Sequence, residues 1–226
     1  VIVLAFISLG ALLVINRPFC FVLLFVVFSF FRIHEALPVL YPMKIPLLLS
    51  IGALSALLWH AFISKELKIF WHHSFNWLAI FWVLTIISIV FASNRQIALA
   101  EFKDIYWKII VMTLAIMWLV NTTENLAKTA MVIIYAGALV SCIAVYNSAN
   151  GIGLVEGSRV TIGRDFGSML GDPNDLALVL MFPLAFTISQ ASTPGIPWFK
   201  RVISAVVCVL LLAAIIATQS RGGLLG

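Results

Sequence analysis

The sequence predicts an all-α fold, a polytopic bundle of transmembrane helices. Hydrophobic residues make up 63% of the 226 positions and charged residues only 10%. Soluble chains contain about 45–50% apolar residues and about 25% charged residues. The apolar residues form continuous runs, while a membrane β-barrel would alternate apolar and polar residues in segments of about ten. The composition and a mean hydropathy of +1.13 therefore exclude a soluble globular domain, and the continuous runs favour helices.

The apolar runs predict about eight spans, since a helix needs about 20 residues to cross a bilayer. The predicted spans are Val1–Ile15, Phe19–Phe31, Leu47–Ile63, Asn76–Ala92, Ile105–Val120, Ala130–Tyr146, Leu176–Gln190 and Val202–Thr218. The first two are short, so they either take in flanking residues or form a partly re-entrant pair. Because the chain lacks a starting methionine and stops directly after an apolar run, we expect residues 1–226 to be a single membrane domain truncated at both ends.

The segment 93–108 has two interpretations. Ser93 followed by Gln96 fits a capping box, and the apolar residues after it fall near one helical side. This pattern predicts an interfacial helix lying on the membrane, with Tyr106 and Trp107 at the level of the headgroups. A simple extension of the next span fits the same residues equally well.

The most polar part of the chain is the connector 147–175, which lies between two apolar runs. It contains two arginines, four carboxylates and six glycines. Ionisable groups beside a membrane core are costly and usually serve a function. We therefore expect a ligand to bind at this connector.

The end of the connector predicts the start of the following helix. Asp172 is a favoured N-cap, Pro173 suits the first helical position, and Asp175 lies three residues past the cap. Helix capping by itself is enough to explain why these residues occur here. A functional interpretation is also open, because a helix N-terminus presents unpaired N–H groups and a partial positive charge, which suit a phosphate. Asp172, Asn174 and Asp175 are therefore candidate residues of a phosphate-binding helix mouth.

Three arginines are candidates to bind a diphosphate, namely Arg159 and Arg164 in the connector and Arg221 after the last span. Guanidinium groups stay charged and bind phosphate bidentately. Gly222 and Gly223 let the backbone turn sharply or approach a ligand closely. The alternative for Arg221 is a side chain that only extends to the membrane interface.

The histidines and cysteines show no metal-binding pattern, and we predict neither a metal nor a cofactor. His72 and His73 are adjacent and lack the i, i+4 spacing of a helical zinc site. His60 is interpreted as a helix-end residue with its own hydrogen-bond partner. The three cysteines lie in separate apolar runs without metal-ligand spacing.

A second polar cluster consists of Arg32, His34, Glu35 and Lys44. His34 and Glu35 are either an acid/base pair or residues with a structural or substrate-lining role. Adjacent residues of a helix point apart, which favours the second alternative.

Charge does not settle the orientation in the membrane. The formal charge of +5 points to lipid headgroups as partners rather than nucleic acid. Lysine and arginine are slightly more numerous on the face that carries the connector 147–175. The positive-inside rule would therefore weakly place this face in the cytoplasm.

Three motifs together resemble one known family. They are Gly171-Asp172-Pro173-Asn174-Asp175-Leu176-Ala177, the two arginines before it, and Ser220-Arg221-Gly222 after the next span. Their order and spacing are similar to the O-antigen ligase and polymerase superfamily, which comprises bacterial inner-membrane enzymes of the Wzy and WaaL type. The segment 31–38 (Phe-Arg-Ile-His-Glu-Ala-Leu-Pro) also resembles the opening region of O-glycosylation ligases in that superfamily.

This resemblance implies a metal-independent, multi-pass glycosyltransferase of the bacterial inner (cytoplasmic) membrane, active in lipopolysaccharide biosynthesis or a related pathway. The donor would be a glycan on undecaprenyl diphosphate, and the acceptor lipid A core, another glycan or a protein. The connector 147–175 would be extracytoplasmic, against the charge count. Family members carry a catalytic histidine in a large loop further along, and no histidine of this chain matches that motif, so the base is expected beyond Gly226.

A transporter or flippase of an anionic lipid-linked substrate is the alternative function. It would use the same arginines for binding and would need no base. Helices broken near the middle of the membrane are typical of transporters, and Pro183 inside a predicted span is the residue that supports this alternative.

Overall fold

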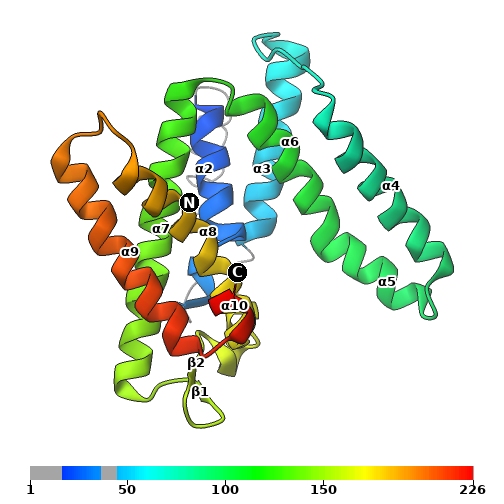
Figure 1. Ribbon diagram of the computed structural model, residues 1–226. Coiled ribbons are helices and arrows are strands. Elements are labelled where there is room, and N and C mark those ends of the chain that lie inside the picture. The colour runs from blue at the N-terminus through cyan, green and yellow to red at the C-terminus, as the bar shows by residue number, and fades with distance from the viewer. Residues whose placement is uncertain (1–16, 37–44, 226) are drawn as a thin grey trace, which may run out of the picture. The chain divides into compact units, whose positions relative to one another are not determined.

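A computed structural model of the protein describes residues 17–36 and 45–225, which are predominantly helical (Figure 1). Five of the described helices are long and apolar enough to cross a membrane: Ile45–Ile63, Ser74–Phe91, Thr123–Asn150, Pro173–Ser192 and Trp198–Thr218. The predicted helical fold is therefore confirmed, five candidate spans support a multi-pass membrane protein, and a total of eight spans is not confirmed.

Three of the eight predicted spans are not among these five helices. Val1–Ile15 lies outside the described residues. Phe19–Phe31 corresponds to α2 (Pro18–Ser29), whose 12 residues extend about 18 Å, short of the roughly 30 Å of hydrocarbon in a bilayer. Ile105–Val120 corresponds to α6 (Trp107–Leu119), the last part of a longer helix whose preceding turn carries Lys103 and Asp104, and this helix is not among the five.

The chain forms two compact units, and the first consists of residues 1–25 and 46–125. Its helices are the first part of α2, α3 (Ile45–Leu58), the π-helical turn η3 (Trp59–Ile63), α4 (Ser74–Phe91), α5 (Arg95–Glu101), the π-helical turn η4 (Phe102–Tyr106) and α6. Phe25, Ala53 and Val111 are buried against one another at its core. None of the side chains of α4 is buried, as expected for an apolar helix that faces lipid.

The segment 93–108 is helical from Arg95, and the helix continues through η4 into α6 without a break. Residues 95–106 therefore extend the following helix toward its N-terminus, as the second interpretation expects. The capping box at Ser93 is wrong, because the side chain of Asn94 accepts the hydrogen bond from the Ile97 N–H at 3.2 Å. Asparagine caps a helix as well as serine does, and it is one position closer to the first turn. A location on the membrane surface stays a prediction.

The second unit consists of residues 26–45 and 126–226. It contains η1 (Ile33–Ala36), most of α7 (Thr123–Asn150), the strands β1 (Leu154–Val155) and β2 (Arg159–Val160), the 3-10 helices η5 (Arg164–Phe166) and η6 (Met169–Gly171), α8 (Pro173–Ser192), α9 (Trp198–Thr218) and α10 (Arg221–Leu225). Helices α8 and α9 form a hairpin and pack along one another (Figure 1). Leu180 of α8 and Leu211 of α9 are completely buried.

A close approach of α7 to α8 depends on one glycine. A β-carbon built on Gly137 would lie 2.4 Å from the Cβ and Cγ of Pro183, so only glycine leaves room for the proline ring. Helix α8 continues through Pro183 to Ser192. The proline therefore serves as a packing surface within an unbroken helix.

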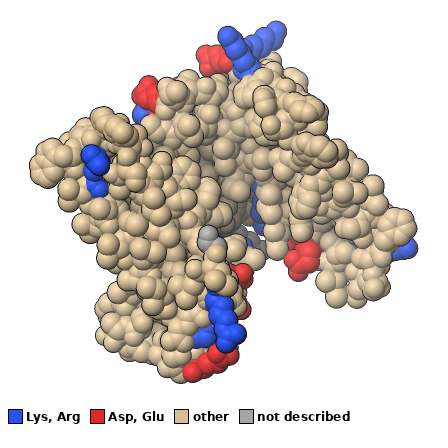
Figure 2. All heavy atoms as spheres, viewed as in Figure 1, with Lys and Arg blue, Asp and Glu red and all other residues tan. Residues whose placement is uncertain are grey.

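Among the described residues, most charged side chains lie near helix ends or in connectors, and Lys103, Asp104 and Lys108 lie within the continuous helix 95–119. The space-filling view shows a surface that is mostly without charge, with lysine, arginine and the acidic residues in small separate groups (Figure 2). Many large apolar side chains are exposed along α4 and α9. This distribution is the one that a lipid environment favours.

Candidate functional site

The connector 147–175 is folded rather than extended. After α7 ends at Asn150, β1 and β2 pair antiparallel, with Val155 opposite Arg159. Val160, Ile162 and Leu170 are buried, which anchors the strand and the 3-10 turns to the helices. The hairpin thereby fixes the backbone of Arg159 beside the start of α8 and the end of α9.

The start of α8 confirms the predicted helix cap. Asp172 is the N-cap, Pro173 is the first helical residue, and the Asp172 carboxylate accepts the Asn174 N–H at 2.7 Å. Asp175 is exposed in the first turn. Because the chain's own carboxylate already occupies this helix end, an anion site here must rely on the arginines more than on backbone N–H groups.

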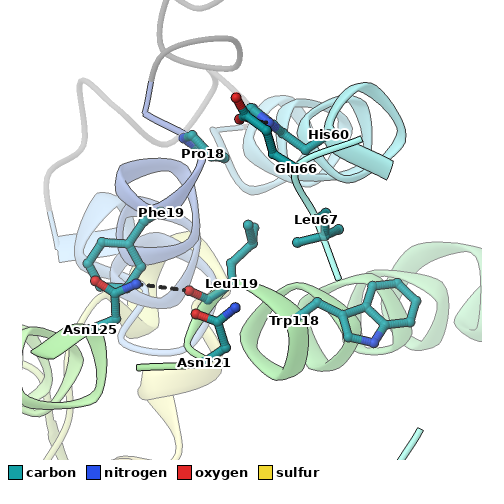
Figure 3. A pocket seen from close by; sticks show the side chains of 9 residues that line it. All are labelled: Pro18, Phe19, His60, Glu66, Leu67, Trp118, Leu119, Asn121 and Asn125. Carbon is teal, nitrogen blue, oxygen red and sulfur yellow. Dashed lines mark hydrogen bonds and ion pairs between the residues drawn. The ribbon is translucent and has the colours of Figure 1, made fainter. Parts of the chain in front are cut away.

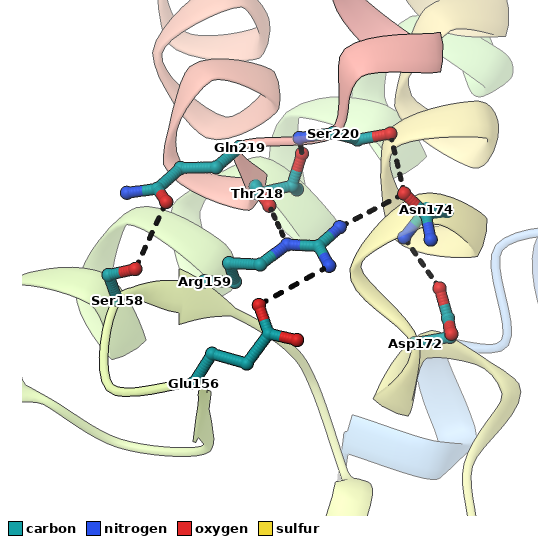
Figure 4. A network of polar contacts seen from close by, with 8 residues as sticks. All are labelled: Glu156, Ser158, Arg159, Asp172, Asn174, Thr218, Gln219 and Ser220. Carbon is teal, nitrogen blue, oxygen red and sulfur yellow. Dashed lines mark hydrogen bonds and ion pairs between the residues drawn. The ribbon is translucent and has the colours of Figure 1, made fainter.

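Arg159 is held in place by two helices. Its Nε donates to the Thr218 carbonyl at the end of α9 at 3.1 Å, and its Nη2 donates to the Asn174 side-chain oxygen at 3.0 Å (Figure 4). Its Nη1 lies 3.9 Å from the Glu156 carboxylate, and 20% of the Arg159 side chain is exposed. The guanidinium group is therefore oriented before any ligand arrives, and it keeps unused N–H donors.

Asn174 joins this arginine to α10. Its side-chain oxygen also accepts the Ser220 hydroxyl at 2.9 Å, and Ser220 Oγ accepts the Gly223 N–H at 3.2 Å. Ser220, which is 1% exposed, is a site residue that was not predicted. Its only sequence signal is its place directly before Arg221.

Arg159 and Arg221 face the same open cleft, which has a volume of about 530 Å³. The cleft is lined by Glu156, Arg159, Asn174, Gln219, Arg221 and Gly222. Arg221 is the exposed first residue of α10. We refer to this hollow as the arginine cleft.

The glycines after Arg221 do not make the expected turn. The chain reverses at Gln219, whose φ is 51°, while Gly222 and Gly223 are helical within α10. A β-carbon on Gly223 would lie 2.6 Å from the Ala177 Cβ. Gly223 is thus needed for the close approach of α10 to α8, which sets the position of Arg221.

Arg164, the third candidate, does not line the arginine cleft. It lies in η5 with an exposed side chain, and its backbone packs against Gly171, where a β-carbon would lie 2.9 Å from the Arg164 Cα. The structure therefore brings together two of the three predicted arginines.

In the second polar cluster, His34 and Glu35 are buried, and Glu35 contacts the connector. The Ser168 hydroxyl donates to Glu35 Oε2 at 2.6 Å, and the other Glu35 oxygen pairs with Arg32. His34 is 5% exposed, and its Nδ1 has no hydrogen-bond partner among the described residues. Burial lowers the pKa of His34; the Glu35 carboxylate partly raises it, and the Arg32 guanidinium lowers it further. Lys44 lies outside the described residues.

A smaller pocket of about 210 Å³ lies within the first unit (Figure 3). His60, Glu66, Asn121 and Asn125 supply polar groups to its wall. His60 Nδ1 lies 3.0 Å from Ser64 Oγ and 3.4 Å from the Glu66 carboxylate, which confirms His60 as a helix-end residue with partners. This pocket has no arginine in its lining.

No three His, Cys, Asp or Glu side chains of residues 17–36 and 45–225 gather in a way that would hold a metal ion. Comparison with known proteins gives no further assignment: no protein-family model matches the chain, and neither a curated protein nor a solved structure matches it. The chemistry of the arginine cleft therefore rests on its own residues, which can bind an anion with two guanidinium groups and hydroxyl groups with a carboxylate and two amides.

Proposed function

We propose that this chain is part of a membrane glycosyltransferase that transfers a glycan from undecaprenyl diphosphate to lipid A core, another glycan or a protein. In this proposal Arg159 and Arg221 bind the diphosphate of the donor. The observation that supports this proposal is the arginine cleft, which these two residues line although they are far apart in the sequence. The reaction type in this proposal comes from the resemblance of three sequence motifs to those of O-antigen ligases.

The two arginines would have different roles. Arg159 is already oriented by Thr218 and Asn174, so binding an oxygen of the diphosphate requires little ordering of its side chain. Arg221 is exposed and can close over the ligand from the other side. As the glycosidic C–O bond breaks, negative charge develops on the diphosphate leaving group, and fixed positive charges stabilise it. This role is electrostatic and needs no proton transfer by either arginine.

The position of the cleft fits a lipid-linked donor. It lies at the junction of the start of α8 and the end of α9, two helices that are long and apolar enough to span a membrane. A diphosphate at this junction would leave its polyprenyl chain beside the apolar helix surfaces. The proposal assigns no base to any residue of this chain.

The transporter alternative gains no support from Pro183. That alternative favours a helix broken at the binding site, whereas α8 is continuous through the proline and packs it against Gly137.

The test measures glycan transfer from a lipid-linked donor by the full-length enzyme. We expect Arg159→Ala and Arg221→Ala each to lower the transfer rate by about 10²–10³-fold, the effect of removing one group that stabilises a developing charge. Arg95→Ala is the matched control, because Arg95 is exposed at the start of α5 and should keep nearly normal activity. Arg164→Ala should reduce the rate by less than about tenfold, since a solvent-exposed charge contributes little. Nearly normal transfer by both Arg159→Ala and Arg221→Ala would overturn the proposal.

A further inference from the structure

The arginine cleft contains more than positive charge. Glu156 and Gln219 line it together with Arg159 and Arg221, and the Glu156 carboxylate lies 3.9 Å from Arg159 Nη1. We propose that Glu156 and Gln219 bind hydroxyl groups of the sugar attached to the diphosphate, and so make the cleft specific for a glycosylated lipid diphosphate. This inference rests on the proposed function and names the part of the ligand that the arginines do not bind.

The backbone of both residues is unusual. Glu156 has a φ of 54° and Gln219 a φ of 51°, which places both in the left-handed region. Residues with a β-carbon adopt this region at a cost in free energy, and glycine does not. Of the four non-glycine residues with positive φ in the described part of the chain, Arg32, Lys65, Glu156 and Gln219, two line this one cleft. Gln219 is the left-handed C-cap of α9, and Glu156 opens the turn between β1 and β2, so each of these tight reversals presents a polar side chain to the cleft.

Both side chains have hydrogen-bonding capacity to spare. The Gln219 side-chain oxygen accepts the Ser158 hydroxyl at 3.0 Å, which orients the amide (Figure 4). Its Nε2 group, with two N–H donors, has no hydrogen-bond partner within the described ranges. The Glu156 side chain is 73% exposed, and its ion pair with Arg159 is long at 3.9 Å. A carboxylate accepts from hydroxyl groups and an amide NH₂ donates to them, so the pair complements a sugar.

The balance of charge in the cleft favours a ligand with two chemical parts. Two arginines attract a diphosphate, but the Glu156 carboxylate beside them repels a bare phosphate at the same place. A sugar diphosphate avoids this conflict when its charged oxygens face the arginines and its neutral hydroxyl groups face Glu156. The same geometry would make an unglycosylated lipid diphosphate the weaker ligand.

The experiment uses the two substitutions that relieve the backbone and remove the side chain, Glu156→Gly and Gln219→Gly, in the full-length protein. Lys65→Gly is the matched control, because Lys65 has a φ of 55° and lies outside the cleft. Binding is measured with undecaprenyl diphosphate and with undecaprenyl diphosphate carrying one sugar, and thermal unfolding is followed in parallel. We expect all three variants to unfold at the wild-type temperature or above, since glycine relieves the strain.

The expected change is in specificity. Glu156→Gly and Gln219→Gly should each weaken binding of the glycosylated lipid by about tenfold or more, the effect of losing a hydrogen bond to a ligand hydroxyl. Binding of the bare lipid diphosphate should be unchanged in Gln219→Gly and unchanged or tighter in Glu156→Gly. Lys65→Gly should bind both lipids as the wild type does.

Two results would overturn the inference and leave the proposed function intact: an unchanged ratio of the two affinities in Glu156→Gly and Gln219→Gly, or a wild-type protein that binds both lipids equally. Failure of the proposed function gives a different result, namely that Arg159→Ala and Arg221→Ala bind the bare lipid diphosphate as tightly as the wild type.

Discussion

The Ser168 hydroxyl donates a buried hydrogen bond of 2.6 Å to the Glu35 carboxylate, and it thereby joins the connector 147–175 to the segment after α2. The backbone is close at the same place, because a β-carbon on Gly163 would lie 2.9 Å from the Glu35 carbonyl oxygen. Glu35 is 5% exposed and Ser168 8% exposed. This contact holds the connector that carries Arg159 against the rest of its unit.

We expect Ser168→Ala to lower the free energy of unfolding by about 1.5–3 kcal/mol, since the substitution removes a hydrogen bond to a buried charged group. Unfolding in mixed micelles measures the change. Ser55→Ala is the control, because Ser55 is exposed on α3 and should change stability by about 0.5 kcal/mol or less. Equal stability of the two variants would show that the Ser168–Glu35 contact does not hold the connector.

Alanine substitutions at the neighbouring residues Gly222 and Gly223 are expected to have very different effects on stability and binding. A β-carbon on Gly223 would lie 2.6 Å from Ala177 Cβ, whereas the nearest atom to one on Gly222 is Ser220 Oγ at 3.9 Å. Gly223→Ala should destabilise the packing of α10 on α8 by about 1–3 kcal/mol, the usual cost of overpacking, and should weaken lipid diphosphate binding by moving Arg221. Gly222→Ala should be tolerated in thermal unfolding and in binding. Similar behaviour of the two variants would contradict the close approach.

Asn174 is expected to matter for ligand binding through Arg159 and Ser220, whose donors it accepts. Asn174→Ala removes both bonds and should weaken lipid diphosphate binding by about tenfold, because Arg159 must then be ordered by the ligand itself. Asn174→Asp keeps the acceptor but adds a negative charge that opposes an anionic ligand, so stability should be retained while affinity falls. Asn150→Ala, at the exposed end of α7, serves as the control and should bind normally. Wild-type affinity in Asn174→Ala would exclude this role.

His34 is expected to make stability depend on pH. Its folded-state pKa is lowered from 6.5, chiefly by burial, with Glu35 opposing and Arg32 adding to the effect. Between the folded-state pKa and 6.5 the unfolded chain binds more protons, so stability rises with pH in this window. The contribution is complete above pH 6.5 and is lost as the pH falls through the folded-state pKa.

Unfolding measured between pH 5 and pH 8 tests this expectation about His34. His34→Gln should flatten the dependence below pH 6.5, whereas His73→Gln, at an exposed position, should leave it as in the wild type. A wild-type slope in His34→Gln would assign the pH dependence to other groups.

The helix starts and the membrane character could be read from local sequence. Asp172-Pro173 predicted the cap of α8 correctly because capping chemistry involves only neighbouring residues. Phe19–Phe31 was predicted as a span, but α2 contains 12 helical residues, since hydropathy does not show where a helix ends. Ser93 and Asn94 are both good caps, and local sequence could not choose between them.

By itself the sequence determined that this protein is a multi-pass helical membrane protein with an arginine-rich connector before a capped helix, because hydropathy and capping depend on residues close in the chain. Only the tertiary structure decided that Arg159 and Arg221 share a cleft while Arg164 does not. It also decided that Asn174 and Ser220 join the site and that Gly223 serves packing against Ala177. These relationships depend on how α8, α9, α10 and the hairpin pack, and no periodicity or motif within one segment records the position of another.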